Sequence, residues 1–180
     1  MGNKAFTRVR DKKLQDLALY LHNDDFHSFC AAVGFVEVNW ALIESQMDRW
    51  VQIAFVKLKI RQRGKNEAPT SFSNKAQFLK LAFSHPLLSR FKSRGLAAVA
   101  EMTRLSEARH DLTHGVVTST KAVDTFRFEL VNRKLQRQTG FHTTKEISFD
   151  IREFPKLGKD LTDLGATSAR LTVDLAGAFL

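Results

Sequence analysis

An arginine and two histidines share one short segment, RHDLTH, residues 109–114. The residues are Arg109, His110 and His114. Imidazole rings exchange protons near neutral pH, so the two histidines are suited to general acid–base catalysis. A guanidinium is a permanent cation with a planar fork of donors. In an α-helix, residues four apart lie on one face, with Arg109 about 100 to 140 degrees round from the histidines. The segment therefore offers two proton-exchanging rings on one helix face and a permanent cation on an adjoining face.

Arg109 also interrupts an apolar pattern. A helix is predicted from about Leu87 to a glycine cap at Gly115, and its inward stripe reads Leu88, Phe91, Gly95, Ala98, Met102, Leu105, Arg109, Leu112. A guanidinium in such a stripe is costly unless it is paired, reaches the edge of the core or serves a function. The structural alternative is an ion pair at the core edge, with Glu44 as the expected partner.

Two other interpretations of the histidines remain open. An i, i+4 pair can supply two ligands of a metal such as zinc, with Asp111 or Glu107 as a third. The HExxH pattern is absent, because Asp111 and Leu112 follow His110. The histidines could also be ordinary surface residues.

The elements that position these residues follow from hydrophobic periodicity. Steps of three and four predict a helix of about nine turns from Phe26 to Ala54, with the seam of a helical bundle. Shorter helices are predicted at residues 11–22 and after Ser73, the latter ending at the His85-Pro86 step. A final helix is predicted from about Pro155 to Leu180. Cys30, the one cysteine, is expected in the core.

Residues 124–151 change to a period of two, which is typical of a β-hairpin. Four of its cations, Arg127, Arg133, Lys134 and Arg137, are predicted RNA-binding residues, because phenylalanines alternate with the basic residues. The alternative is that these phenylalanines pack on the bundle and the cations are only solvated.

The predicted fold is mainly α, an antiparallel up-and-down bundle of four to five helices with a β-hairpin before the last helix. We expect one domain over residues 1–180, comprising a core bundle at 24–118, the hairpin at 124–151 and a helix at 155–180. The chain carries 28 Lys and Arg against 19 Asp and Glu, a formal charge of +9, which favours polyanionic partners. No apolar h-region or membrane span is expected, so the predicted location is the cytoplasm.

A resemblance is carried by LSEARHDLTHG, residues 105–115. The segment resembles the R-x4-6-H signature of the HEPN superfamily, with Arg109 at the arginine, His110 at the polar position and His114 at the histidine. The long preceding helix, with its Trp40 to Glu44 segment, is similar to helices of HEPN-like bacterial proteins. The resemblance covers about residues 24–118, and His110 departs from the more usual Asn.

The resemblance implies a helical bundle that acts as a homodimer, with two motifs meeting across a cleft. It implies a metal-independent endoribonuclease without a cofactor, among whose relatives are toxins and defence effectors with an antitoxin or other regulatory partner. His114 would move the proton in 2′-hydroxyl attack, Arg109 would hold the phosphate, and His110 would orient His114 or carry a second proton, with Glu44 and Asp111 in support. The alternative is a catalytically inactive dimeric bundle that binds RNA or a partner protein.

Overall fold

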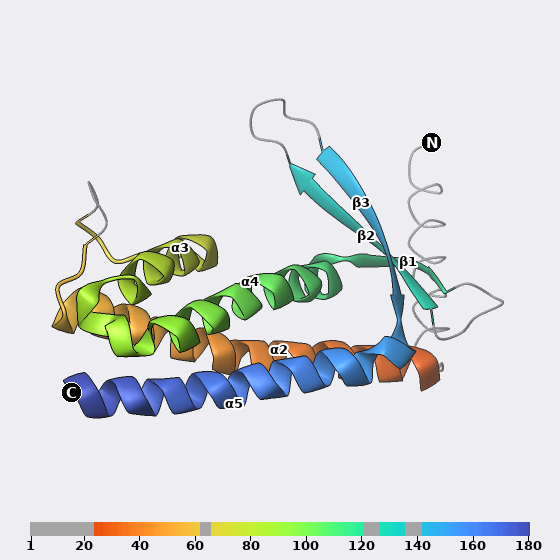
Figure 1. Ribbon diagram of the computed structural model, residues 1–180. Coiled ribbons are helices and arrows are strands. Elements are labelled where there is room, and N and C mark those ends of the chain that lie inside the picture. The colour runs from red at the N-terminus through yellow and green to blue at the C-terminus, as the bar shows by residue number, and fades with distance from the viewer. Residues whose placement is uncertain (1–23, 62–65, 121–126, 136–141) are drawn as a thin grey trace, which may run out of the picture.

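The computed structural model describes residues 24–61, 66–120, 127–135 and 142–180. This part of the chain is mainly helical, as predicted. Its helices are α2 (Asp24–Gln52), α3 (Phe72–Phe83), α4 (Lys92–His114) and α5 (Phe154–Phe179), and its strands are β1 (Val116–Thr120), β2 (Arg127–Leu135) and β3 (His142–Asp150). Figure 1 shows long helices lying side by side, with the strands projecting from one end. The helix predicted at residues 11–22 lies outside the described residues.

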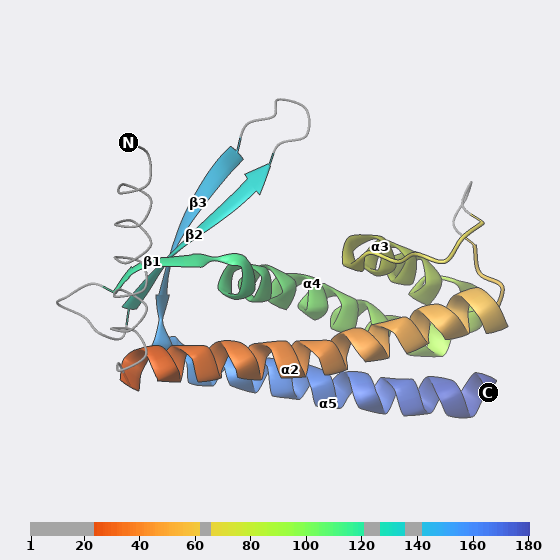
Figure 2. The ribbon, with the colours of Figure 1, turned by 180° about the vertical axis from the view of Figure 1, so that it is seen from behind.

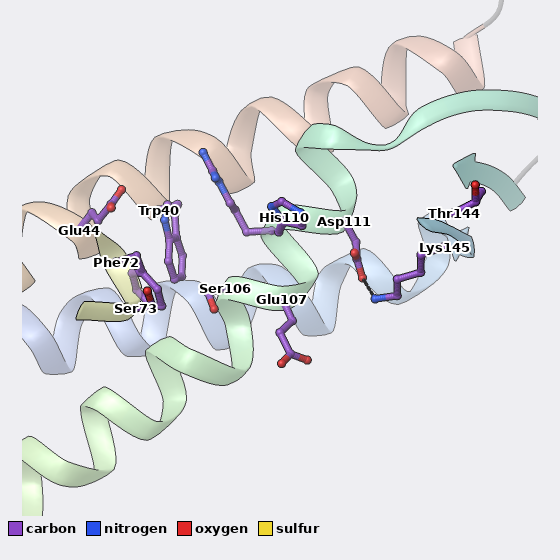
Figure 3. A pocket seen from close by; sticks show the side chains of 11 residues that line it. Trp40, Glu44, Phe72, Ser73, Ser106, Glu107, His110, Asp111, Thr144 and Lys145 are labelled. Carbon is purple, nitrogen blue, oxygen red and sulfur yellow. Dashed lines mark hydrogen bonds and ion pairs between the residues drawn. The ribbon is translucent and has the colours of Figure 1, made fainter. Parts of the chain in front are cut away.

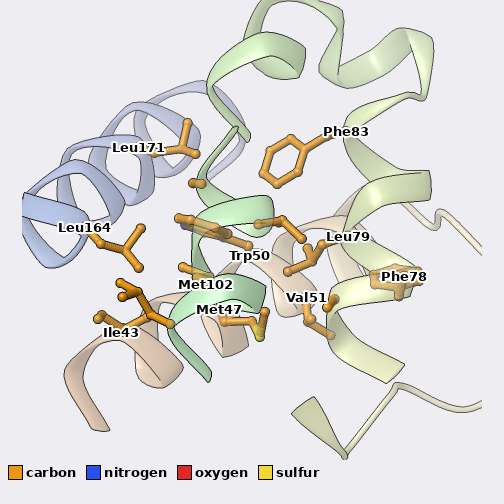
Figure 4. Packing of buried hydrophobic residues seen from close by; sticks show 14 of the residues in the cluster. Ile43, Met47, Trp50, Val51, Phe78, Leu79, Phe83, Met102, Leu164 and Leu171 are labelled. Atoms are coloured by element: carbon orange, nitrogen blue, oxygen red, sulfur yellow. The ribbon is translucent and has the colours of Figure 1, made fainter. Parts of the chain in front are cut away.

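Helix α2 supplies one wall of the core. Ile43 and Met47 are fully buried and Trp50 nearly so, as the three-and-four spacing predicts. Figure 4 shows these side chains converging with Met102 and Leu164 from α4 and α5. Burial of a large apolar side chain contributes about 1.5–3 kcal/mol, so this cluster stabilises the bundle. A π-helical turn, Ile53–Lys57, continues α2 to the start of the basic residues that follow it.

Helices α3 and α4 meet at a tight corner. Ser71 caps α3 by accepting a hydrogen bond from the Asn74 N–H, so the helix starts slightly earlier than predicted. His85 is extended before its proline, and a 3-10 turn, Pro86–Phe91, leads into α4. Helix α4 therefore begins later than the predicted Leu87.

The order of the helices is not the up-and-down series that the periodicity predicts. Phe72 at the start of α3 contacts Trp40, and Phe83 at its end contacts Trp50, so α3 runs in the same general direction as α2. A tight turn after α2 would have reversed the direction. Instead, α3 begins at Phe72, back at the level of Trp40. No local pattern in the sequence encodes that return.

Helix α5 runs parallel to α2 along its length. Phe35 contacts Phe154 near the start of both helices, and the Trp50 indole N–H donates to the Thr172 hydroxyl near their ends at 2.7 Å. Figure 2 shows the two helices side by side with α4 across them. This pair forms a long base under the segment that carries Arg109.

The strands form a three-stranded antiparallel sheet in the order β1-β2-β3. The segment predicted as a hairpin contains β2 and β3, which pair from Arg127↔Asp150 to Leu135↔His142. Strand β1 was not expected. Gly115 is the C-cap residue of α4, as predicted, and its N–H donates to the Asp111 carbonyl oxygen. Its backbone is extended, with φ −71° and ψ 131°, and not left-handed, so α4 passes directly into β1.

Helix α2 differs from expectation in two further respects. Cys30 is exposed, because its neighbour Phe29 takes the inward position on the helix. The helical run from Phe26 to Lys57 is also long and apolar enough, by length and composition, to cross a membrane. The core helix of a soluble bundle has the same properties, and the inward face of α2 packs against the other helices.

Candidate functional site

Arg109 lies at the edge of the core, where it pairs with Glu37 of α2. Its Nε donates to Oε1 at 2.7 Å and its Nη2 donates to Oε2 at 2.9 Å. The Thr113 hydroxyl lies within hydrogen-bond reach of the same carboxylate and of the Arg109 carbonyl oxygen. The Arg109 and Glu37 side chains are 26% and 34% exposed, so the pair is shielded but remains open to solvent.

This arrangement stabilises the ionised form of Glu37. The hydrogen bonds from Arg109 hold the pKa of the carboxyl below its ordinary value of 4.5, and the Thr113 hydroxyl and the charges of Arg109 and His114 act in the same direction. Partial burial opposes them by raising the pKa. Glu37 is therefore an anion at neutral pH that accepts bonds from two side chains of α4.

The predicted partner of Arg109 was Glu44, and that prediction is wrong. Helices α2 and α4 run in opposite directions, as Figure 2 shows, so the last turns of α4 lie beside the first half of α2. Glu37 is therefore level with Arg109, whereas Glu44 lies two turns further along α2. Glu44 still lines the groove beside Arg109.

His110 and His114 contact each other on the outer side of α4. Their ring centroids are 4.7 Å apart with the planes tilted by 58°, and both residues are exposed. The i, i+4 spacing on the last turns of the helix places one ring above the other, as predicted. Two adjoining imidazoles can both take up and release protons, so the pair is chemically suited to acid–base work.

A groove of about 660 Å³ opens beside Arg109, and we name it the Arg109 groove. Figure 3 shows the aromatic rings of Trp40 and Phe72 at one end and Lys145 at the other. The lining residues come from α2, α3, α4 and β3: Trp40, Glu44, Phe72, Ser73, Ser106, Glu107, Arg109, His110, Asp111, Thr144 and Lys145. This size accommodates a small organic ligand or one nucleotide unit. His114 is not among the lining residues.

Asp111, a predicted supporting residue, connects α4 to the sheet. Its carboxylate accepts a bond from the Lys145 ammonium of β3 at 2.5 Å, as Figure 3 shows. The Asp111 side chain is mostly shielded, whereas Lys145 is exposed. This ion pair closes one end of the groove.

The predicted RNA-binding cations lie in or beyond β2. Arg127, Arg133 and Lys134 are part of that strand, and Arg133 pairs in register with Thr144, which lines the groove. Arg137 lies outside the described residues. A contact of these four residues with RNA stays a prediction.

The metal alternative needs a third ligand beside His110 and His114. Among the described residues, no three His, Cys, Asp or Glu side chains converge as a metal site requires. Asp111, one of the expected third ligands, pairs with Lys145 instead. The described geometry thus does not support a metal centre at the histidines.

Glu37 and Thr113 are the residues of this site that sequence reasoning missed. Glu37 carried a signal, because it is the one acid in the apolar stretch 26–43. A lone carboxylate in such a stretch calls for a cation, just as Arg109 calls for an anion. Pairing these two exceptions would have identified the contact.

Comparison with protein-family models, with curated proteins and with solved structures finds no match. The site is therefore interpreted from its own chemistry.

Proposed function

We propose that this protein is a metal-independent endoribonuclease that cleaves single-stranded RNA. The observation that carries the proposal is that Arg109 and His110 line one groove and that the His110 ring contacts the ring of His114. The formal charge of +9 supports a polyanionic substrate. The resemblance of the segment to the HEPN signature assigns the same three residues to RNA cleavage.

In the proposed reaction, the ribose 2′-oxygen attacks the adjacent phosphorus and the bond to the 5′-oxygen breaks. His114 removes the 2′-hydroxyl proton, and His110 protonates the departing 5′-oxygen. The products are a 2′,3′-cyclic phosphate and a 5′-hydroxyl. Because the nucleophile is the 2′-hydroxyl, RNA is cut and DNA is not.

Arg109 would bind the phosphate and stabilise the additional negative charge of the transition state. A guanidinium has five N–H donors, and Glu37 uses one on Nε and one on Nη2. Three donors remain for phosphate oxygens. The ion pair holds the side chain in place before substrate binds, which reduces the entropy lost on binding.

A second candidate function rests on the same ion pair. The Glu37 carboxylate pairs with the Arg109 guanidinium and accepts a hydrogen bond from the Thr113 hydroxyl. A purely structural contact at the edge of the core would have the same bonds. In that case the bundle is catalytically inactive and binds RNA or a partner protein. The two candidates differ in whether removal of Arg109 affects chemistry or only stability.

The test is cleavage of fluorescent single-stranded RNA in EDTA by the native protein, His114→Ala and Arg109→Ala. We expect each variant to lose about 10²- to 10³-fold in rate, the usual effect of removing a proton carrier or a transition-state donor. A substrate with 2′-deoxyribose at every position should remain intact. Product analysis should find a 2′,3′-cyclic phosphate.

Matched controls are His27→Ala, an exposed histidine on α2, and Arg104→Ala, an arginine of α4 that pairs with Glu101 of α4 and Asp160 of α5. Both should cleave at the native rate. If the native protein binds RNA without cutting it, the inactive bundle is supported. Cleavage that requires added zinc would support the metal alternative.

A further inference from the structure

Helix α2 carries a second apolar face that the rest of the bundle covers only at Phe35, whose ring contacts Phe154 of α5. Phe35, Val38 and Leu42 are 41%, 73% and 49% exposed, although all three are large and hydrophobic. Clustered exposed apolar residues of this kind mark interaction surfaces.

The exposed positions on α2 follow a heptad line. From Ser28 the steps of three and four lead through Ala31 to Phe35, Val38 and Leu42, and end at Ser45, with every one of these residues exposed. No charged residue lies on this line over about five turns. Such a line is the seam along which two helices pack.

The line is complementary to itself when it is reversed. A two-fold axis between Phe35 and Val38 places Phe35 opposite Val38 of a second copy and Ala31 opposite Leu42. Small residues then face large ones, which is the arrangement that lets two helices interdigitate.

The charges at the ends of the line fit the same register. Asp24 lies one step before Ser28, and Arg49 lies one step after Ser45, so each carboxylate is placed opposite a guanidinium of the second copy. Asp24 and Arg49 form no ion pair within the described residues. Opposite charges at the two ends of the line complement an antiparallel copy of the same helix. A lipid surface would not require this arrangement of charges.

We propose that the outward line from Asp24 to Arg49 is a homodimer surface on which two α2 helices pack antiparallel. The contact is isologous, because both copies use the same surface and each pair of facing residues occurs once on either side of the two-fold axis. It extends over about 38 Å at 1.5 Å per residue. Glu37 lies about 100 degrees round the helix from Val38 and about 140 degrees from Leu42, on the side of α4. The Arg109 groove therefore stays open in this dimer, and each protomer keeps a complete site.

The proposed dimer differs from the one that the resemblance implies, in which two motifs meet across a cleft, and it does not rest on RNA cleavage. Dimerisation is measured without substrate. Failure of the surface and failure of the ribonuclease activity are therefore separate results.

The experiment is sedimentation equilibrium of the native protein and Val38→Asp. We expect a native dimer and at least about tenfold weaker association for the variant, because two carboxylates would be buried at the centre of the contact. Leu87→Asp is the control, since Leu87 is 52% exposed but lies outside α2. It should leave the dimer intact.

Charge reversal tests the register. Asp24→Arg should weaken association by about fivefold through repulsion from Arg49 of the second copy, and Arg49→Asp in the same chain should restore it. A parallel arrangement would not give this rescue. Circular dichroism confirms that each variant keeps its helices.

Three outcomes would overturn the proposal. The native protein could remain monomeric at its highest soluble concentration, or Val38→Asp could dimerise as well as the native chain. The protein could also float with lipid vesicles in a manner that Val38→Asp abolishes while no dimer forms, which would assign the face to a membrane surface.

Discussion

The two halves of α4 differ in what they contact. The first half packs apolar surface tightly, with Gly95 against the Phe83 ring of α3 and Met102 fully buried. The last two turns hold a half-exposed ion pair, two contacting histidines and a groove. Since a continuous helix joins the halves, a rigid apolar region can position a polar region that contributes little stability of its own. Substitutions should therefore separate stability from function along one helix.

The largest effect is expected in the apolar half. Phe83 is 1% exposed, and its ring meets Trp50 edge to face with centroids 5.8 Å apart. Phe83→Ala should lower the free energy of unfolding by about 3–5 kcal/mol through lost burial and a residual cavity. Urea unfolding followed by tryptophan fluorescence measures it. A loss below about 1 kcal/mol would mean that the corner collapses freely and that this half is not tightly packed.

Gly95 tests the same contact from the other side. A Cβ built at Gly95 would lie 2.3 Å from the Phe83 ring, so Gly95→Ala should destabilise the protein by about 1–3 kcal/mol. Gly165→Ala is the control, because open space surrounds its built Cβ. The better helix propensity of alanine should then stabilise the protein by about 0.5–1 kcal/mol.

The sign at Gly95 should reverse when the ring is absent. In the Phe83→Ala background the added methyl enters empty space, so Gly95→Ala should become neutral or stabilising in the same unfolding measurement. Destabilisation of equal size in both backgrounds would show that the cost arises elsewhere in α4.

A substitution in the polar half should lower the free energy of unfolding by a smaller amount. Glu37→Gln removes a charge that accepts two hydrogen bonds from Arg109, and we expect a stability loss of about 1 kcal/mol because the pair is partly solvated. If Arg109 acts on phosphate, the cleavage rate should fall further than this stability loss explains. Glu101→Gln, in an exposed i, i+3 pair with Arg104, is the control and should affect neither measurement appreciably.

The Glu37 contribution should also depend on pH in a definite direction. The pKa of Glu37 is lowered in the folded state, mainly by hydrogen bonds from Arg109, so the unfolded chain binds a proton more readily. The stabilisation is complete above the ordinary pKa of 4.5 and is lost as the pH falls through the lower folded value. Urea titrations across this acidic range should show a steeper loss for the native protein than for Glu37→Gln. Parallel curves would exclude this contribution.

The contrast between the halves also explains how much could be predicted from the sequence. Apolar periodicity correctly predicted the inward positions Ile43, Met47 and Trp50, because burial of one stripe determines a helix face locally. It could not predict the direction of α3, which is seen only in tertiary contacts such as that of Phe72 with Trp40. Strand β1 was missed because Val116–Thr120 is short and lacks a clear alternation of apolar and polar residues.

For the site, the unusual residues could be predicted from the sequence, but the partner of Arg109 could not. Arg109 was recognisable as a charge in an apolar stripe, and the spacing of His110 and His114 predicted their contact. The partner of Arg109 depends on how α4 is aligned against α2, which is a tertiary property that no local pattern encodes. For this reason Glu44 was expected where the structure has Glu37.

The smallest effect is expected where the site meets the sheet. Lys145 is 62% exposed, so its ion pair with Asp111 should contribute no more than about 0.5 kcal/mol, and Lys145→Met should unfold almost as the native protein does. The side chain nevertheless ends the groove with a positive charge. If RNA lies there, the variant should raise KM several-fold at low salt with little change in kcat, since a peripheral cation aids binding equally in the ground and transition states. An unchanged KM would place the RNA path on the other side of Arg109, away from β3.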